Sequence, residues 1–341
     1  MKAVVHSEQG TADVLRLTDL DLGEPAAGEV RLRIAVSGVN PTDWKARSGL
    51  YGEGDIPVSV PNQDGAGIVD AVGPDVEGLS VGDRVWVTLA AHERPASGTA
   101  QEYTVVPAGR VFPLPEGAGF DLGASTGVPG ITAHRALTVG EDLPTRIAPG
   151  AFDGKVVLVA GGAGAVGHAA IQLARWAGAT VVTTVSGPPK SDYAKAAGAH
   201  HVVNYRDDDA AEQIRGFAPG GVDLIVEVAA GRNSALDLAV LKPRGTIAIY
   251  ANDGDAPFAP NVRQNMGLNA RYQFVLLYSV GWDKLTAAAE DLNAAIAAGA
   301  LPVGEAAGLP LHYYSLDQAA EAHRAVECGA TGKVLLKIAE L

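Results

Sequence analysis

The glycines of the stretch VAGGAGAVGH, residues 159–168, are the residues of this sequence whose spacing points most directly to chemistry. Gly162, Gly164 and Gly167 fit the pattern G-x-G-x-x-G, and Gly161 allows a second pattern, G-x-x-G-x-x-G. A glycine loop turns tightly and lets backbone N–H groups approach a phosphate at the positive end of a following helix. The same glycines would also allow close packing of a helix on a strand, so the flanking elements decide between the two.

Those flanking elements favour phosphate binding. Residues 156–160 (VVLVA) are a continuous apolar run, which is typical of a buried parallel strand, and residues 165–178 repeat apolar residues at helical spacing. A glycine loop between a strand and a helix is much more specific than the glycine pattern alone. The loop is therefore predicted to bind the pyrophosphate of a dinucleotide through Gly161, Gly162, Ala163, Gly164, Ala165, Val166 and Gly167.

The end of the next predicted strand, residues 180–185, indicates which dinucleotide. Enzymes that use NAD usually carry an acid at this point, whereas this sequence has Ser186 and Gly187, followed by Lys190. A hydroxyl and an ammonium attract a 2′-phosphate that a carboxylate would repel. The sequence therefore predicts NADPH as the cofactor, with a solvated first-turn lysine as the alternative for Lys190.

Around this loop, strands and helices alternate, which predicts an α/β fold with a doubly wound parallel sheet over residues 125–298. Residues 1–124 and the return segment 299–341 are mainly β in character. The further strands of the sheet are predicted at 201–205, 222–228, 245–250 and 271–278.

Composition sets broad limits on function. The 341 residues carry a formal net charge of −13, which disfavours nucleic-acid binding. The single cysteine, Cys328, excludes an internal disulfide and a cysteine-rich zinc site. We expect no secretory signal and no membrane span, since neither pattern is visible, and hence a cytoplasmic enzyme.

The chain contains the stretches SGVNPTDWKARSG (37–49), GAGIVDAVG (65–73), VGDRV (81–85), GVPGITAHRAL (127–137), AGGAGAVG (160–167), AGAHHVVNYRD (197–207) and ATGKVLLKI (330–338). Together they resemble the medium-chain dehydrogenase/reductase superfamily, and within it the zinc-free quinone oxidoreductase (zeta-crystallin-like) branch. The resemblance covers nearly the whole chain. It implies a GroES-like catalytic domain built from both chain ends around a Rossmann domain, with Lys190 at the family's 2′-phosphate lysine and Tyr205 at its adenine-ribose tyrosine.

The zinc-ligand turns of the superfamily are altered in this chain. Where zinc members place Cys and a His-Glu pair, it carries Asn40, Gln63 and Asp64. Neutral amides are weak zinc donors, so we expect no catalytic metal. Without a Lewis acid, the remaining chemistry is hydride transfer to an activated acceptor, which is a quinone or an α,β-unsaturated carbonyl compound.

Three residues are candidates for stabilising charge on that acceptor. Asn40 offers an amide donor, and Lys45 and Tyr51 offer charge or a proton. Some quinone reductases of the branch carry an aromatic residue at the position of Lys45. The lysine in this chain is more similar to the enone reductases of the same branch. Each also has a structural interpretation: Asn40 as a turn cap before Pro41, Lys45 as a solvated helix residue, and Tyr51 as an edge residue with its hydroxyl in water.

Two other functions are open at this stage. The stretch GASTG, residues 123–127, matches the G-x-S-x-G nucleophile elbow of α/β-hydrolases, with Asp121 and His134 nearby. That elbow requires a preceding strand, which the sequence lacks, so a helix-start Ser/Thr cluster is favoured. The second is a non-catalytic, crystallin-like NADPH-binding protein. The family further implies a homodimer, and residues 271–280 are predicted to be an apolar edge strand suited to pairing.

Overall fold

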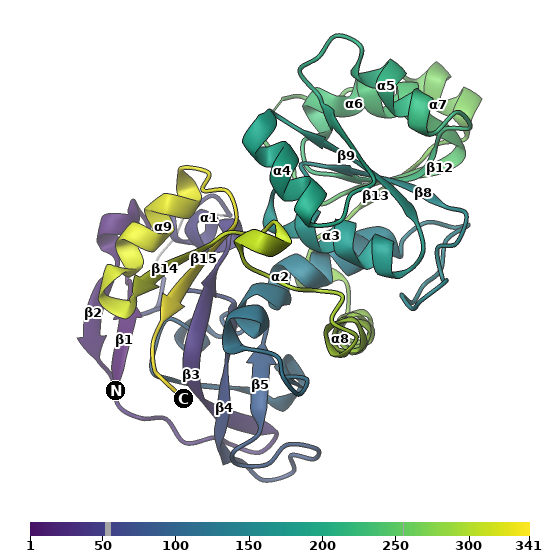
Figure 1. The fold of residues 1–341 in the computed structure, drawn as a ribbon. Coiled ribbons are helices and arrows are strands. Elements are labelled where there is room, and N and C mark those ends of the chain that lie inside the picture. Colours follow the sequence, from purple (N-terminus) through teal and green to yellow (C-terminus); the bar gives the residue numbers. More distant parts are fainter. Residues whose placement is uncertain (52–55, 255) are drawn as a thin grey trace. The chain divides into compact units, whose positions relative to one another are not determined.

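The structure is a computed structural model that describes residues 1–51, 56–254 and 256–341 (Figure 1). It contains two compact units. Unit 1 comprises Met1–Val128 and Leu311–Leu341, and unit 2 comprises Pro129–Pro310. Helix α2 (Phe120–Leu137) runs through the boundary between Val128 and Pro129. The sequence predicted this boundary slightly earlier, after residue 124.

Unit 1 is mainly β, and its sheet includes strands from both ends of the chain. Its main sheet has the order β14-β15-β3-β4-β5-β7, with β6 also paired to β3, and β1 and β2 form a separate pair. In Figure 1 the yellow strand β15 runs beside the purple strand β3, and the two are antiparallel. The strands are β1 (Lys2–Val5), β2 (Arg16–Asp19), β3 (Glu29–Val39), β4 (Asp64–Val72), β5 (Arg84–Val87), β6 (Tyr103–Pro107), β7 (Val111–Pro113), β14 (Leu311–Ser315) and β15 (Lys333–Lys337), and the helices are α1 (Pro41–Arg47) and α9 (Ala319–Glu327).

The long strand β3 gives unit 1 its core. Val30, Leu32 and Ile34 alternate with half-buried residues and are themselves fully buried, packing with Val69 and Val85. This alternation is the pattern of a strand with one face toward the core. From Ala35 onward every residue of β3 is buried, so the strand enters the interior at the end that leads to Asn40.

Unit 2 is a parallel six-stranded sheet with the order β10-β9-β8-β11-β12-β13. This is the doubly wound order, in which the direction of strand addition reverses between the first and the fourth strand. The strands are β8 (Val156–Ala160), β9 (Thr180–Val185), β10 (His201–Asn204), β11 (Val222–Glu227), β12 (Leu241–Ile249) and β13 (Arg271–Phe274). The helices are α3 (Ala165–Trp176), α4 (Pro188–Ala196), α5 (Ala210–Phe217), α6 (Ala230–Val240), α7 (Val262–Leu268) and α8 (Trp282–Ala297). The predicted fold class is confirmed.

The prediction of a strand over residues 271–280 was wrong in its length. Strand β13 ends at Phe274, and the N–H of Val275 donates to the carbonyl of Ile249 at 2.8 Å. Ile249 is the last residue of the neighbouring strand β12, so no further ladder is available to the chain. Val275 and Leu277 are buried instead, and Leu277 begins a single 3₁₀ turn, Leu277–Ser279.

Within the described ranges 1–51, 56–254 and 256–341, no helix combines the length and the apolar character that crossing a lipid bilayer requires.

Candidate functional site

The glycine loop lies at the carboxyl edge of the parallel sheet, between strand β8 and helix α3. Gly161 has a φ of +71°, in the left-handed region, and Gly164 is the residue that precedes the first turn of α3. The N–H groups of Gly161 and Gly162 donate to the carbonyl of Thr184, at 3.0 and 3.2 Å, which fixes the loop to the end of β9. The free N–H groups of the first turn of α3 form a positive end suited to an anion.

The glycines of the loop serve different purposes. A Cβ atom at Gly162 would lie 2.1 Å from Oγ1 of Thr183, and one at Gly167 would lie 2.4 Å from the carbonyl oxygen of Gly161. Those two positions are required for packing inside the protein. At the exposed Gly164, however, the nearest atom would be 3.5 Å away, which is an ordinary contact. The protein's own packing does not require glycine there, whereas a ligand lying against the backbone would, so the loop fits a dinucleotide.

The residues predicted to determine the cofactor preference lie just after the ends of two neighbouring strands. Ser186 follows β9 and Tyr205 follows β10, and the N–H of Tyr205 donates to the carbonyl of Val185 at 3.1 Å. Lys190 is exposed in the first turn of α4.

Arg206 is a residue that the sequence analysis missed. Its guanidinium donates to the carbonyl of Ser186 at 3.1 Å and lies 5.8 Å from the centre of the Tyr205 ring. The signal was present in the stretch NYRD, because an arginine near the end of these strands is a common partner of a 2′-phosphate.

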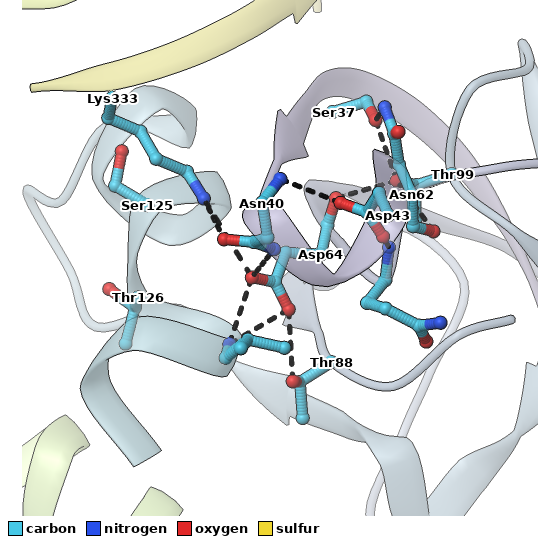
Figure 2. A network of polar contacts seen from close by, with 12 residues as sticks. Ser37, Asn40, Asp43, Asn62, Asp64, Thr88, Thr99, Ser125, Thr126 and Lys333 are labelled. Atoms are coloured by element: carbon cyan, nitrogen blue, oxygen red, sulfur yellow. Dashed lines mark hydrogen bonds and ion pairs between the residues drawn. The ribbon is translucent and has the colours of Figure 1, made fainter. Parts of the chain in front are cut away.

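Asn40 lies in a buried polar network of unit 1 (Figure 2). Its Nδ2 donates to Oδ2 of Asp64 at 2.7 Å, and its Oδ1 accepts from Nζ of Lys333 at 2.6 Å. The Lys333 ammonium is also 3.9 Å from the Asp64 carboxylate. A carboxylate only accepts and an ammonium only donates, so these two neighbours determine which way the Asn40 amide points.

Asp64 receives further donors on both of its oxygens. The hydroxyl of Thr88 donates at 3.0 Å, and the N–H of Val128, in helix α2, lies 2.9 Å from each oxygen. Burial raises the pKa of Asp64, while Lys333 and these hydrogen bonds act in the opposite direction. Burial likewise lowers the pKa of Lys333, against the attraction of Asp64 and Asp43. Each charge of the buried pair therefore depends on the other.

Asp43 holds the turn that carries Asn40. Its carboxylate accepts from the N–H of Asn40 at 2.7 Å and from the N–H of Gln63 at 3.1 Å, so it joins the turn that carries Asn40 to the turn that carries Gln63 and Asp64. Burial raises the pKa of Asp43 to about 7, although both backbone hydrogen bonds lower it. Asn40 is at the same time the N-cap of α1, as the turn interpretation expects.

The three predicted catalytic residues differ in their surroundings. Asn40 is only 2% exposed and both ends of its amide are engaged. Lys45 is half-buried on α1, with its ammonium 5.8 Å from the centre of the Trp44 ring, and Tyr51 is 63% exposed. The structure thus joins Asn40 to Lys333, a residue that the sequence analysis did not select. Its signal was a lysine directly before the apolar residues Val334–Leu336 of a strand.

The hydrolase alternative is not supported by the geometry. Ser125 lies inside helix α2, not on a turn after a strand, and its hydroxyl donates to the carbonyl of Asp121 at 2.7 Å. The Nε2 atom of His134 lies 2.7 Å from the carboxylate of Asp291, which Arg146 also binds. The serine and the histidine are each committed to other partners, so no nucleophilic pair is assembled.

Comparison with known proteins agrees with this architecture. Residues 26–116 match the alcohol dehydrogenase GroES-like domain, and residues 165–293 match the zinc-binding dehydrogenase family. The human quinone oxidoreductase is 31% identical over 340 residues, covering 98% of this chain and 97% of its own. The 2-haloacrylate reductase of a Burkholderia species is 31% identical over 276 residues, covering 79% and 78%. The crystal structure of Escherichia coli quinone oxidoreductase complexed with NADPH has a TM-score of 0.82 at 26% identity, covering 99% and 100%.

These matches show that the chain belongs to the medium-chain dehydrogenase/reductase superfamily, in the branch of the quinone oxidoreductases. The protein is an oxidoreductase enzyme. Its relatives therefore favour turnover over the alternative of a dinucleotide-binding protein without catalysis.

Proposed function

We propose that this enzyme is a zinc-independent, NADPH-dependent reductase that transfers hydride to a quinone or to an α,β-unsaturated carbonyl compound. The observation that carries the proposal is the position of the Lys333 ammonium. It donates to Asn40 and lies beside the carboxylate of Asp64, at the altered zinc-ligand turns. A resident cation there repels a divalent metal and leaves an oriented amide in its place. The names of the human and Burkholderia relatives support both acceptor classes.

The decisive experiment measures NADPH oxidation by the purified enzyme against a panel of quinones, enones and alkenals. Turnover with at least one of these classes, and none with simple alcohols and NADP⁺, supports the proposal. Oxidation of simple alcohols as the dominant activity contradicts it.

In the proposed reaction, bound NADPH supplies a hydride to the β-carbon of an enone or to a quinone. The electron pair displaced from the double bond moves onto the carbonyl oxygen, and a proton completes the product. An amide has two N–H donors, and Asp64 uses one of those of Asn40. We propose that the other donates to the developing oxyanion, and that its donor strength is raised because Lys333 polarises the amide through Oδ1. Lys45 and Tyr51 are the proposed sources of further charge or of the proton.

NADPH is the proposed cofactor because Ser186, Lys190 and Arg206 provide donors and positive charge where NAD enzymes have an acid. Tyr205, with the Arg206 guanidinium beside its ring, is the proposed partner of the adenine ribose. The solved NADPH complex of the Escherichia coli relative is consistent with this choice.

We expect the Lys190→Ala variant to raise the KM for NADPH roughly tenfold or more while NADH use changes little, since one charge-assisted contact to the 2′-phosphate is lost. Steady-state kinetics with both cofactors measures this. Lys195→Ala is the matched control, because Lys195 is exposed on the same helix and pairs with Asp192 at 4.0 Å. Equal use of NADPH and NADH by the unmodified enzyme contradicts the cofactor assignment.

We expect full activity without zinc. Asn40 and Gln63 are neutral donors, and the carboxylate of Asp64 is already occupied by hydrogen bonds. Elemental analysis of the active enzyme should find zinc well below one ion per chain, and chelators should leave the rate unchanged. A rate that chelators abolish and zinc restores is the contrary result.

We also propose a homodimer formed along the edge strand β13. This strand is the last in its sheet; its final residue, Phe274, is 62% exposed, and Leu276, two residues further along the chain, is 57% exposed. Burying such an edge against a second copy pairs the strand and removes apolar surface from water.

Light scattering should then report about twice the chain mass of 34.9 kDa at micromolar protein. Phe274→Lys should shift the mass toward the monomer. Leu22→Lys serves as control, because Leu22 is 45% exposed in the other unit. A monomer mass for the unmodified protein refutes the dimer.

A further inference from the structure

Unit 2 contains a cavity of about 660 Å³ at the carboxyl ends of strands β12 and β13. Its walls are largely apolar or aromatic and include Ile249, Tyr250, Phe274 and Val275. The glycine loop lies at the same edge, after β8, and only β11 separates β8 from β12. At a strand spacing of about 4.8 Å, the cavity begins on the order of 10 Å from the loop.

This position places the cavity on the acceptor side of the proposed cofactor site. A doubly wound sheet has two halves, and a dinucleotide lies across the point where they meet. Ser186 and Lys190 follow strands of the half that would hold the adenosine. The half formed by β11, β12 and β13 is then the one that receives the nicotinamide and the molecule it reduces.

Both charged residues that line the cavity are cationic. They are Arg135, near the end of α2, and Lys284, in the first turn of α8. No carboxylate is among the lining residues, in a chain whose net charge is −13. The nearest acid along α8 is Asp283, which is exposed, does not line the cavity and lies 3.3 Å from the Lys284 ammonium.

The Arg135 guanidinium is only partly satisfied by the protein. One of its terminal nitrogens donates to the hydroxyl of Thr138 at 3.2 Å, while Nε is buried and has no hydrogen-bond partner in the described part of the chain. Burial lowers the pKa of this group, and Asp283 raises it. A half-buried guanidinium with an unused donor is costly unless an anion binds it, and its planar fork matches a carboxylate.

We propose that this cavity binds a carboxylate of the acceptor, with Arg135 as the main specificity-determining residue and Lys284 as a supporting charge. The preferred acceptor is thus an α,β-unsaturated carbonyl compound that also carries a carboxylate, and not a neutral quinone. This inference rests on the proposed function.

The kinetic test compares acetylacrylate with its methyl ester, using the full-length enzyme and NADPH. The ester is the more electrophilic of the two, so a higher kcat/KM for the acid reports recognition of the carboxylate and not intrinsic reactivity. In Arg135→Met we expect the acid-to-ester ratio of kcat/KM to fall roughly tenfold to a hundredfold, mainly through the KM of the acid. Lys284→Met should lower the ratio less, and Lys195→Met, an exposed cation outside the cavity, should not change it. An unmodified enzyme that prefers the ester overturns the proposal.

The phosphates of the cofactor are the other source of negative charge. The Kd for NADPH, measured by fluorescence titration, should be the same in Arg135→Met as in the unmodified protein. A raised Kd, with acid and ester affected alike, would show that Arg135 binds the cofactor and overturn the proposal.

A binding measurement separates this inference from the proposed function. Levulinate, a saturated keto acid, is titrated by calorimetry into the enzyme loaded with NADP⁺. Binding that Arg135→Met abolishes supports the carboxylate site even if no acceptor in the panel is reduced. Absence of binding at millimolar levulinate overturns the site, whatever the enzyme reduces. Melting curves of each variant verify that it is folded.

Discussion

Replacing Lys333 with methionine is expected to lower the free energy of unfolding by about 3–5 kcal/mol at neutral pH. The side chain is 2% exposed, and methionine keeps most of its volume but removes the ammonium. Asp64, which is fully buried, would then either hold an unpaired charge or take up a proton, both at a cost in free energy, and Oδ1 of Asn40 would lose its donor. Urea unfolding followed by circular dichroism measures the change.

The double variant Lys333→Met/Asp64→Asn is the control for this prediction. It removes both charges, so it should recover a large part of the stability lost in the single variant. If the free energy of unfolding of the single variant falls by less than about 1 kcal/mol, the ion pair contributes no more than an exposed pair does. That result contradicts the assignment of Lys333 and Asp64 as a buried charged pair.

Asn40→Ala is expected to lower kcat roughly a hundredfold or more, with little change in NADPH affinity, because an oxyanion donor acts mainly in the transition state. Stopped-flow and steady-state rates with the best acceptor of the panel measure the effect. The loss could instead come from disturbing Asp64, so Thr88→Val is the matched control. Thr88 is also fully buried and donates to the same carboxylate at 3.0 Å, but it is not proposed to contact the acceptor.

If Thr88→Val loses as much activity as Asn40→Ala, the network acts as a structural support and Asn40 has no direct part. If Asn40→Ala keeps near-full turnover with every acceptor, the oxyanion is stabilised elsewhere. Lys45, which is half-buried on α1, the helix that Asn40 caps, would then be the candidate for that role.

The secondary-structure elements that were predicted best from the sequence are those determined by residues close together in the chain. The apolar runs at 156–160 and 180–185 became β8 and β9 with the expected limits, since the pattern of a buried strand is local. The strand expected over 271–280 stopped at Phe274 because its length depends on where β12 ends, and the segment itself does not contain that information.

The candidate site was predictable only in part for the same reason. The importance of Asn40 was visible because the superfamily places a zinc ligand there. Its partners Asp64 and Lys333 lie 24 and 293 residues away in the chain, and Lys333 stands at the start of a strand, where a lysine usually reaches solvent. Only the pairing of β15 with β3 brings that lysine inside. The roles proposed for Lys190, Tyr205, Lys45 and Tyr51 remain predictions.

The pairing of β15 with β3 also has a consequence for how the protein is made. On the ribosome, β3 emerges early and must wait for β15, which follows only after all of unit 2. At about 5–20 residues per second, the roughly 290 residues between β3 and β15 take on the order of 15–60 s to synthesise. During that time residues 36–39 of β3 lack the strand that pairs with them, and Asp64 lacks the lysine that balances its charge. Unit 2, whose residues are contiguous, can complete its sheet first. The nascent chain is therefore most exposed to aggregation and to chaperone binding through the part of unit 1 that precedes unit 2, Met1–Val128.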